Sequence, residues 1–356
     1  MQNIRMTKYK TKIYSAEWQS PSNLAIVKYW GKKEIQKPLN PSISFSLNNA
    51  VTTTRVTATH TNKAGFTFLL DGNKKDTFNA KIASLLQLAS STLPFINTHH
   101  LTIESSNTFP HSSGIASSAS SMSALALCLA ELQLKVDNNI NDNIDIQMVS
   151  DLARMGSGSA ARSVYGGWTI WGKTPAIPES SDNYAVELND IHPNFMQIAN
   201  AILIIEPDSK KVSSSKGHAL MNNHPYGVAR IKQANDNTQQ LLEVLKTGDW
   251  NQFFDIAEHE ALSLHALMMS SNPGYTLLHA NSLKVIEEVR KAFLELQLPV
   301  GFSMDAGPNV HLLYPKYEEK SILSWIEEKI RPLCYEQKII FDQLGNGPIK
   351  TNILEH

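Results

Sequence analysis

Cysteine is scarce in this sequence, which has only Cys128 and Cys334 among its 356 residues. So few cysteines exclude a disulfide framework and fit a reducing compartment, and we therefore expect a cytoplasmic protein. Long apolar runs are missing as well, since no stretch approaches the ~18 residues of a membrane span. Residues 1–18 are polar and mixed, without the apolar centre of a signal peptide. We expect no membrane partner.

An excess of either charge is also missing, because 32 Lys and Arg face 33 Asp and Glu. Proteins that bind nucleic acid or anionic surfaces by general electrostatics usually carry a basic surplus. We therefore expect no nucleic-acid partner, although the balance is compatible with a local basic pocket. A chain of this length can bury one large core or two moderate ones.

Several common catalytic signatures are absent from the sequence. The stretch of small and hydroxylated residues from Phe109 to Ala124 is not a Walker A loop, since no Gly-Lys-Ser/Thr ends it. No set of His, Cys and carboxylate residues has zinc-ligand spacing, and no local motif indicates a Ser/His/Asp triad. We therefore assign no metal ligands among those residues and interpret His111 and His311 as structural.

What the sequence does contain is a stretch of small and hydroxylated residues from Phe109 to Ala124. Apolar side chains recur at helical spacing after Met122 and also cover other faces, which predicts a helix from Ser117 that is buried nearly all round. The free amides at the start of such a helix need partners. Ser117 and Ser118 can cap them, or a phosphate can bind there, because N–H groups and the helix dipole attract anions. This stretch alone leaves both interpretations open.

The pattern along the rest of the chain mixes strands and helices. Strands are predicted at 22–30, within 43–68, and at 100–105, 201–206, 299–304, 309–314 and 337–343, and helices at 79–93, 146–155, 226–247, 251–269, 282–296 and 318–330. Strict βαβ alternation is missing, so we predict an α+β fold. The pattern is interrupted at 190–200, which predicts two lobes, 1–196 and 197–356.

A lysine interrupts the first apolar strand at position 28, between Val27 and Tyr29. Burying an unpaired lysine is costly. Either Lys28 lies at the strand end and reaches water, or it pairs with an anion or favours the ionised form of a carboxylate.

Three loops carry further polar groups. Residues 156–162 offer backbone amides, two hydroxyls and the Arg162 guanidinium, which suit an oxyanion or a phosphate, or else form a turn with a surface arginine. Residues 212–216 hold a serine cluster that can bind a ligand or cap a helix in solvent. Asp305 ends a strand before a Gly-Pro turn, where a carboxylate can act as a base, act electrostatically, or form an Asx turn.

Together these segments resemble the mevalonate diphosphate decarboxylases of the galactokinase–homoserine kinase–mevalonate kinase superfamily. The resemblance rests on Asn-Leu-Ala-Ile-Val-Lys-Tyr-Trp-Gly-Lys at 23–32 with Pro-Leu-Asn-Pro-Ser-Ile-Ser at 38–44, on a stretch at 110–119 similar to the superfamily's phosphate loop, and on the segments 156–162 and 305–309. The phosphate loop alone indicates only the superfamily. The Lys-Tyr-Trp-Gly-Lys run and the Asp-Ala-Gly-Pro-Asn turn are much more specific to the decarboxylases, as is the lack of an Asp base in the Gly-Ser loop.

This resemblance implies a two-lobed kinase-like fold of that superfamily, with an N-terminal lobe like ribosomal protein S5, a ferredoxin-like C-terminal lobe and an active site between them. It implies ATP and Mg²⁺, with mevalonate 5-diphosphate as the substrate. The C3 hydroxyl would be phosphorylated, and loss of phosphate and CO₂ would give isopentenyl diphosphate. Close alternatives are a mevalonate monophosphate decarboxylase and a mevalonate 3-kinase, and a more distant one is a non-catalytic sensor of a phosphorylated ligand. The family also often forms homodimers, which no pattern in the sequence decides.

The resemblance also implies a role for each matched residue. Asp305, Lys28 and Arg162 would be catalytic: Asp305 as base or electrostatic partner at C3, Lys28 as the charge that keeps it ionised, and Arg162 as the clamp on the substrate carboxylate. The diphosphate end or the orientation of the substrate would depend on Tyr29, Lys32, Ser157, Ser159 and Ser214. The ATP phosphates would contact Ser112, Gly114, Ser117 and Ser118, with Ser118 also a candidate magnesium contact.

Overall fold

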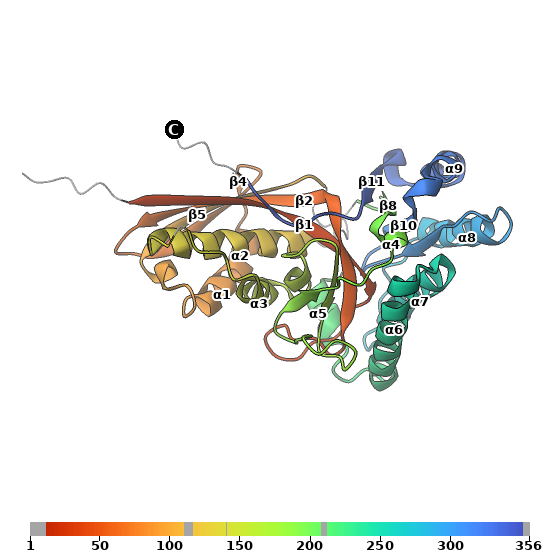
Figure 1. The fold of residues 1–356 in the computed structure, drawn as a ribbon, viewed down its shortest axis with the longest axis horizontal. Helices are drawn as coiled ribbons and strands as arrows, with labels where there is room; N and C mark the ends of the chain where they lie inside the picture. Colours follow the sequence, from red (N-terminus) through yellow and green to blue (C-terminus); the bar gives the residue numbers. More distant parts are fainter. Residues whose placement is uncertain (1–11, 110–116, 140, 208–211, 352–356) are drawn as a thin grey trace, which may run out of the picture.

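The computed structural model describes residues 12–109, 117–139, 141–207 and 212–351. Within these ranges it has two lobes, each built on one sheet and its helices, which confirms the predicted α+β fold (Figure 1). The division of the chain at residues 196 and 197 stays a prediction, because the last strand pairs with the first strand in the N-terminal sheet.

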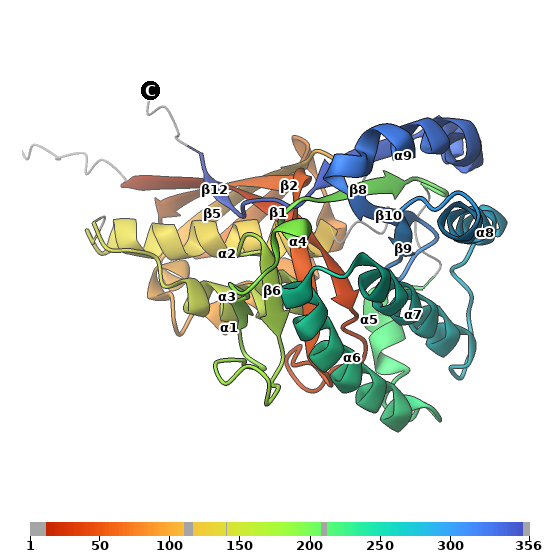
Figure 2. The same ribbon diagram turned by 45° about the vertical axis from the view of Figure 1, so that its right-hand side comes forward.

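The first lobe contains a mixed sheet in which β12, β1, β2, β5, β3 and β4 follow one another and β6 and β7 extend from β2. Its strands are β1 (Ile13–Val27), β2 (Ser42–His60), β3 (Gly65–Leu70), β4 (Asn73–Lys74), β5 (His99–Asn107), β6 (Trp168–Trp171), β7 (Ala185–Glu187) and β12 (Ile349–Lys350), and its helices are α1 (Asn79–Ala89), α2 (Ser117–Val136), α3 (Ile146–Gly156) and the short α4 (Pro193–Met196). Helices α1 to α3 cover one face of the sheet (Figures 1 and 2).

Helix α2 confirms the prediction of a helix that starts at Ser117 and is buried nearly all round. It packs against β1 and β2, and an unbroken run of its residues from Met122 to Leu132 is buried. Helix α1 likewise buries the predicted stripe of Ile82, Leu85, Leu86 and Ala89. In both helices the apolar spacing was sufficient to predict the element, because local periodicity decides which face meets the sheet.

The first strand differs from its prediction. Instead of a short strand at 22–30, β1 runs from Ile13 to Val27 and pairs with β2 along almost its whole length. Its first half is only partly buried and therefore has no apolar run, and pairing with β2 makes it a strand. Because the strand ends at Val27, Lys28 lies just beyond the last ladder pair, Val27 with Ile43.

The second lobe contains an antiparallel sheet in the order β11, β8, β10 and β9. Its elements are β8 (Ile198–Leu203), β9 (Gly301–Ser303), β10 (Val310–Pro315), β11 (Ile339–Gln343), α5 (Ser214–Ala219), α6 (Gly227–Thr247), α7 (Trp250–Met269), α8 (Ala280–Leu294) and α9 (Glu319–Trp325), which continues as a π-helical turn over Ile326–Ile330. Alternate residues of β8 face opposite sides, so Ala199 and Leu203 pack with α8 and α9 while Ile198 and Ile202 pack with α6 and α7.

A hydrophobic core joins the two lobes. Leu24 and Ile26 of β1 belong to the same buried cluster as Ile202 of β8, Leu313 of β10 and Phe253 of α7. Each of these side chains is almost fully buried, so separating the lobes would expose apolar surface at a substantial cost. This packing carries the end of β1 against the second lobe, and with it the residue that follows the strand.

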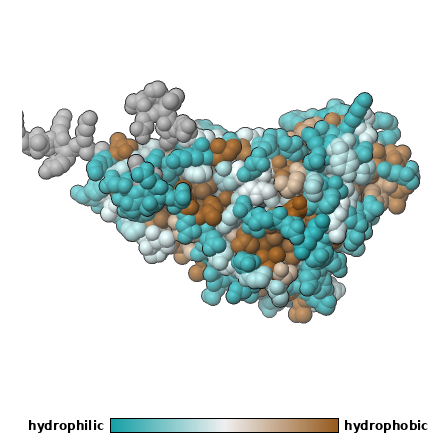
Figure 3. All heavy atoms as spheres, viewed as in Figure 1, coloured by the Kyte–Doolittle hydropathy of each residue, from teal (hydrophilic) through white to brown (hydrophobic). Residues whose placement is uncertain are grey.

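The surface in the view of Figure 3 is mostly hydrophilic, with hydrophobic area gathered near the middle of the molecule. Among the helices of the described ranges, none is long and apolar enough to cross a membrane.

Candidate active site

A cavity of about 310 Å³ lies where the two lobes meet. It is lined by the end of β1, the start of α2, the 3₁₀ turn at Gly158–Arg162, the start of α5 and the turn between β9 and β10. The predicted site residues on this lining are Lys28, Tyr29, Lys32, Ser118, Ser157, Ser159, Arg162, Ser214 and Asp305. Ser117 lines a neighbouring cavity. Ser112 and Gly114 lie outside the described residues.

Lys28 of the first lobe meets Asp305 of the second in this cavity. The Lys28 Nζ lies 2.9 Å from Asp305 Oδ1, 2.8 Å from Ser303 Oγ and 2.5 Å from the Ala25 carbonyl oxygen. These three acceptors match the three protons of an ammonium group. Lys28 is only 2% exposed, so the interpretation of a strand-end lysine that reaches water is wrong.

Opposing effects act on the charge of Lys28. Burial is the largest and lowers the pKa of Lys28, because a desolvated ammonium loses its hydration. The Asp305 and Glu260 carboxylates act in the other direction, and the Arg162 guanidinium adds to the lowering. The net result is a lowered pKa, so the protonated state of Lys28 depends on its carboxylate neighbours.

Arg162 is buried rather than placed on a surface turn. It is 2% exposed, because residues 158–162 form a 3₁₀ turn packed mainly against α2 and α3 instead of a flexible loop. Its Nη1 donates to Ser42 Oγ at 2.5 Å. Burial lowers the pKa of Arg162 to about 10, which leaves it a cation at neutral pH.

Buried polar atoms without partners surround the same cavity. Of the seven buried side-chain nitrogen and oxygen atoms without a hydrogen-bond partner among the described residues, three belong to residues that line this cavity: Arg162 Nε, the Tyr29 hydroxyl and Asn23 Oδ1. Such atoms are rare in folded proteins because each costs desolvation energy. Their position around one cavity indicates a site that is completed by a polar ligand.

Hydroxyl groups connect the start of α2 to the 3₁₀ turn. Ser118 Oγ lies 3.1 Å from Ser157 Oγ, and the Ser159 carbonyl accepts a hydrogen bond from Asn23 Nδ2 at 3.1 Å. Gly158 allows the Tyr29 ring to approach, since a Cβ at this position would lie 2.7 Å from the Tyr29 hydroxyl oxygen. The small side chains therefore leave space at the N-terminus of a buried helix, where anions are favoured.

The serine cluster at 213–215 both caps a helix and lines the cavity. Ser213 caps α5 by accepting the Lys216 N–H at 3.3 Å, which is the predicted helix cap. All three serines nevertheless line the cavity. The cap interpretation and the ligand interpretation are therefore compatible.

His218 follows this cluster and was missed in the sequence. Its ring lies between Tyr29 and Trp30, with centroid distances of 4.4 and 4.6 Å, and its Nδ1 accepts the Gly31 N–H at 3.0 Å. Burial and then Lys32 lower the pKa of His218 to about 3. The ring is therefore neutral, and because Nδ1 is an acceptor, Nε2 carries the proton.

Two lysines bring positive charge to the lining of the same cavity. Lys32, which donates to Gln36 Oε1 at 3.1 Å, has its pKa lowered by burial. Lys81 of α1 was also missed, since a polar residue on a helix has no distinguishing spacing. Burial, followed by Lys32, lowers the pKa of Lys81 to about 8. Lys81 lines this cavity and its neighbour.

The neighbouring cavity is smaller, at about 140 Å³, and mostly apolar. It lies beside the start of α2, and its apolar lining comes from Phe68, Leu70, Phe78, Ile82, Ile103, Met122 and Leu125. Ser117 and Ser118 also line it. A flat apolar group can therefore bind beside the helix start while anionic groups attached to it reach the larger cavity.

The fold is that of the galactokinase–homoserine kinase–mevalonate kinase class of enzymes, with the start of a buried helix and a lysine–carboxylate pair at one cavity between two lobes. The model of the diphosphomevalonate decarboxylase-like N-terminal domain matches residues 20–185, and that of the mevalonate 5-diphosphate decarboxylase C-terminal domain matches residues 200–351. The chain belongs to the diphosphomevalonate decarboxylase family.

Known relatives resemble the chain over nearly its whole length. The diphosphomevalonate decarboxylase of Candida albicans is 27% identical, covering 96% of this chain and 99% of the relative. The crystal structure of mevalonate diphosphate decarboxylase from Staphylococcus aureus has a TM-score of 0.83 at 29% identity, covering 96% and 99% of the two chains. A structure of the protein designated MDDEF in complex with MVAPP, AMPPCP and magnesium has a TM-score of 0.83 at 27% identity, covering 96% and 100%.

Proposed function

We propose that this protein catalyses the ATP-dependent decarboxylation of mevalonate 5-diphosphate to isopentenyl diphosphate, with release of ADP, phosphate and CO₂. The observation that carries the proposal is the pair of buried Lys28 and partly buried Asp305 in one cavity with Arg162. A tertiary hydroxyl is a very poor leaving group, whereas its phosphate ester leaves readily. ATP therefore prepares C3 for loss of the carboxylate.

We assign ATP to both cavities. The adenine fits the apolar cavity beside α2, and the phosphates extend toward Ser118 at the helix start, where N–H groups and the dipole favour anions. Lys81 lies on both linings and can neutralise the phosphate chain between them. The contacts of Ser112, Gly114 and Ser117 with the phosphates stay a prediction.

Magnesium fits this site as a phosphate-bound ion. The described residues contain no group of three or more His, Cys, Asp or Glu side chains that could hold a metal. The Ser118 hydroxyl is then the protein's candidate ligand, and the other ligands would be phosphate oxygens and water, as Mg²⁺ prefers. The ion would neutralise phosphate charge during transfer.

The substrate is oriented by charges at its two ends. We assign the carboxylate at C1 to Arg162, whose unpartnered Nε supplies a donor. The diphosphate lies toward Lys32, Ser214 and the Tyr29 hydroxyl, with Ser157 and Ser159 beside it. The Nε2–H of neutral His218 can add a donor to the same end.

Asp305 faces C3 and acts on charge there. Because the Lys28 ammonium is bonded to it, the carboxylate is favoured in its ionised form and is a weak base. We therefore assign it to hold the C3 hydroxyl by accepting its hydrogen bond, while the hydroxyl proton passes to a phosphate oxygen. As the C3–O bond breaks with its electrons on phosphate, the Asp305 carboxylate stabilises the positive charge that develops on C3.

Decarboxylation completes the reaction. The C1–C2 bond breaks, and its electron pair forms the C2–C3 double bond as CO₂ leaves. Arg162 holds the carboxylate so that the breaking bond stays aligned with the empty orbital at C3. Phosphate, ADP and CO₂ then account for every atom that leaves the two substrates.

The decisive experiment is incubation of the protein with MgATP and, separately, mevalonate, its 5-phosphate and its 5-diphosphate, with ADP and CO₂ measured together. The proposal expects equal amounts of both products with the diphosphate. ADP without CO₂ would make the protein a 3-kinase, and preference for the 5-phosphate would make it a monophosphate decarboxylase. Neither product with any ester would favour a sensor of phosphorylated ligands.

We further propose a cytoplasmic homodimer, from the cysteine usage and the resemblance described above. Light scattering coupled to size-exclusion chromatography tests the dimer, and a mass near 39.6 kDa, that of a single chain, would exclude it.

A further inference from the structure

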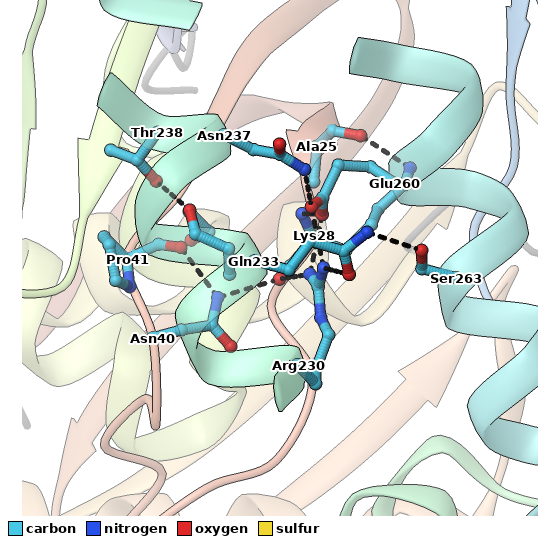
Figure 4. A network of polar contacts seen from close by, with 12 residues as sticks. Ala25, Lys28, Asn40, Pro41, Arg230, Gln233, Asn237, Thr238, Glu260 and Ser263 are labelled. Atoms are coloured by element: carbon cyan, nitrogen blue, oxygen red, sulfur yellow. Dashed lines mark hydrogen bonds and ion pairs between the residues drawn. The ribbon is translucent and has the colours of Figure 1, made fainter. Parts of the chain in front are cut away.

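A buried ion pair joins two helices of the second lobe beside Lys28 (Figure 4). Arg230 of α6 and Glu260 of α7 make two parallel contacts, Nη1 to Oε1 at 2.7 Å and Nη2 to Oε2 at 2.6 Å. Arg230 is 3% exposed and Glu260 is fully buried. Asn237 adds a hydrogen bond to Glu260 Oε1 at 2.6 Å. Neither charged residue lines the cavity of the active site.

The Arg230–Glu260 pair forms hydrogen bonds with both the N–H and the carbonyl of Lys28. The Lys28 N–H donates to Glu260 Oε2 at 2.7 Å, and the Lys28 carbonyl accepts from Arg230 Nη2 at 3.1 Å. Asn40 Nδ2 donates to the same carbonyl at 3.0 Å. The ladder of β1 ends one residue earlier, so these buried peptide groups need partners from outside the sheet.

Helix α7 also holds the partner of Lys28. His265 Nε2 donates to the main-chain oxygen of Asp305 at 3.2 Å. One helix therefore contacts the backbone of both members of the pair, Lys28 through Glu260 and Asp305 through His265. A buried ion pair adds little net stability by comparison with well-packed apolar residues, so stability alone is a weak reason for it.

We propose that Arg230 and Glu260 are positioning residues that fix the backbone of Lys28 and thereby hold its ammonium group at Asp305. The inference rests on the decarboxylase function proposed above and extends it to residues that do not touch the substrate. Correct placement matters because a shift of about 1 Å at a reacting group can cost about 100-fold in rate.

Glu260 of this pair also affects the protonation of Lys28. The charged or titratable groups around Lys28 are Asp305 in the β9–β10 turn, Glu260 on α7, Arg230 on α6, Arg162 in the 3₁₀ turn and His311 on β10. Glu260 raises the pKa of Lys28, against the lowering by burial. Loss of the Glu260 charge should therefore lower the pKa of Lys28, so that Lys28 loses its proton at a lower pH.

The first test is Glu260→Gln, assayed with MgATP and mevalonate 5-diphosphate. We expect kcat to fall about 10- to 100-fold with KM changed less than about threefold. The high-pH limb of the kcat profile should also move to lower pH. A purely structural role would lower the amount of folded enzyme without moving that limb. An unmoved limb and a wild-type kcat would overturn the proposal.

The second test separates positioning from folding. Replacing both residues in Arg230→Met with Glu260→Met removes both charges, which buried sites often tolerate, but leaves the Lys28 peptide without these partners. We expect near-normal thermal stability and a low kcat. Asn237→Ala is the matched control, since it contacts Glu260 but not Lys28, and it should keep kcat. If the double variant does not fold, the position of the high-pH limb in the kcat profile of Glu260→Gln alone tests the positioning role.

A readout without turnover keeps this inference distinct from the proposed function. Lysine labelled with ¹³C at Cε allows Lys28 to be titrated by NMR in the free protein. We expect Glu260→Gln to lower the Lys28 midpoint and Asn237→Ala to leave it unchanged. Equal midpoints in all three proteins would refute the positioning role, whereas an inactive wild type with the expected shift would refute only the decarboxylase function.

Discussion

Lys28 and Asp305 are 277 positions apart in the sequence, yet their side chains meet at 2.9 Å in a cavity between two lobes. The contact exists because the apolar end of β1 packs against the second lobe, while the turn after β9 brings Asp305 to the same place. Each lobe supplies one member, so the pair forms only when the lobes are packed together.

Asp305→Asn should abolish most of the decarboxylation. An amide cannot stabilise the positive charge at C3 as a carboxylate does, and we expect CO₂ release to fall at least about 1000-fold. If the carboxylate acts on charge rather than as a base, a single turnover should still produce ADP and accumulate the C3-phosphorylated intermediate. Rapid-quench measurement of ADP and CO₂ tests this, and equal loss of both products would instead assign Asp305 as the base.

Arg162→Gln should weaken orientation of the substrate carboxylate. We expect kcat for CO₂ release to fall about 100-fold, because a bidentate cation is replaced by a neutral amide in a buried site. Ser42→Ala is the control, since it removes only the hydroxyl that accepts from Arg162 Nη1. Steady-state CO₂ release compares the variants, and a larger loss in Ser42→Ala than in Arg162→Gln would contradict the assigned clamp.

His218→Phe should affect substrate binding more than catalysis. The new ring can keep the stack with Tyr29 and Trp30, but it lacks the Nε2–H donor and leaves the Gly31 N–H without its acceptor. We expect KM for mevalonate 5-diphosphate to rise about 10-fold, close to the effect of one lost hydrogen bond to a charged group. Because the His218 pKa is about 3, wild-type KM should show no His218 titration between pH 6 and 8. A KM inflection near pH 6.5 that disappears in the variant would disprove the neutral donor.

Lys81→Met should raise the thermal stability of the protein and lower its affinity for MgATP. The pKa of Lys81 is about 8 in the folded protein, below the ordinary 10.5 of an exposed lysine, so the unfolded chain binds more protons between these values. The cost of desolvating this partly buried charge is fully present below pH 8 and is relieved as pH rises to about 10.5. The variant should therefore unfold at a higher temperature than wild type at pH 7, with the difference closing by pH 10.5.

The same variant should bind MgATP more weakly, because it removes a cation between the two cavities. Calorimetric titration at pH 7 measures this affinity, and thermal unfolding followed by circular dichroism from pH 7 to 10.5 measures the stability difference. Unchanged ATP affinity would remove Lys81 from the nucleotide site, and a pH-independent difference in unfolding temperature would contradict its lowered pKa.

Much of the molecule follows from local patterns in the sequence. The stripe at 82–89 predicts α1, and the all-round apolar character after Ser117 predicts α2, because helical periodicity alone decides which side chains can share a face. The hydroxyl and glycine loops and the Asp-Ala-Gly-Pro-Asn turn mark where function concentrates, since such residues suit close approach to a ligand rather than a core.

Other features depend on contacts between distant segments. The first half of β1 has no apolar run and becomes a strand only by pairing with β2. Arg162 looks like a surface residue of a flexible turn until packing buries that turn. His218, Lys81, Arg230 and Glu260 have no distinguishing spacing, so no local signal could single them out.

The sequence by itself therefore determined the α+β class, the helices with regular apolar spacing and the residue types that the chemistry needs. Only the tertiary structure decided that Lys28 is fully bonded, that Arg162 is buried with an unpartnered nitrogen, and that an ion pair of α6 and α7 holds the Lys28 backbone. The physical reason is that periodicity acts over a few neighbouring residues, whereas burial and charge pairing are set by segments that meet only after the lobes have packed.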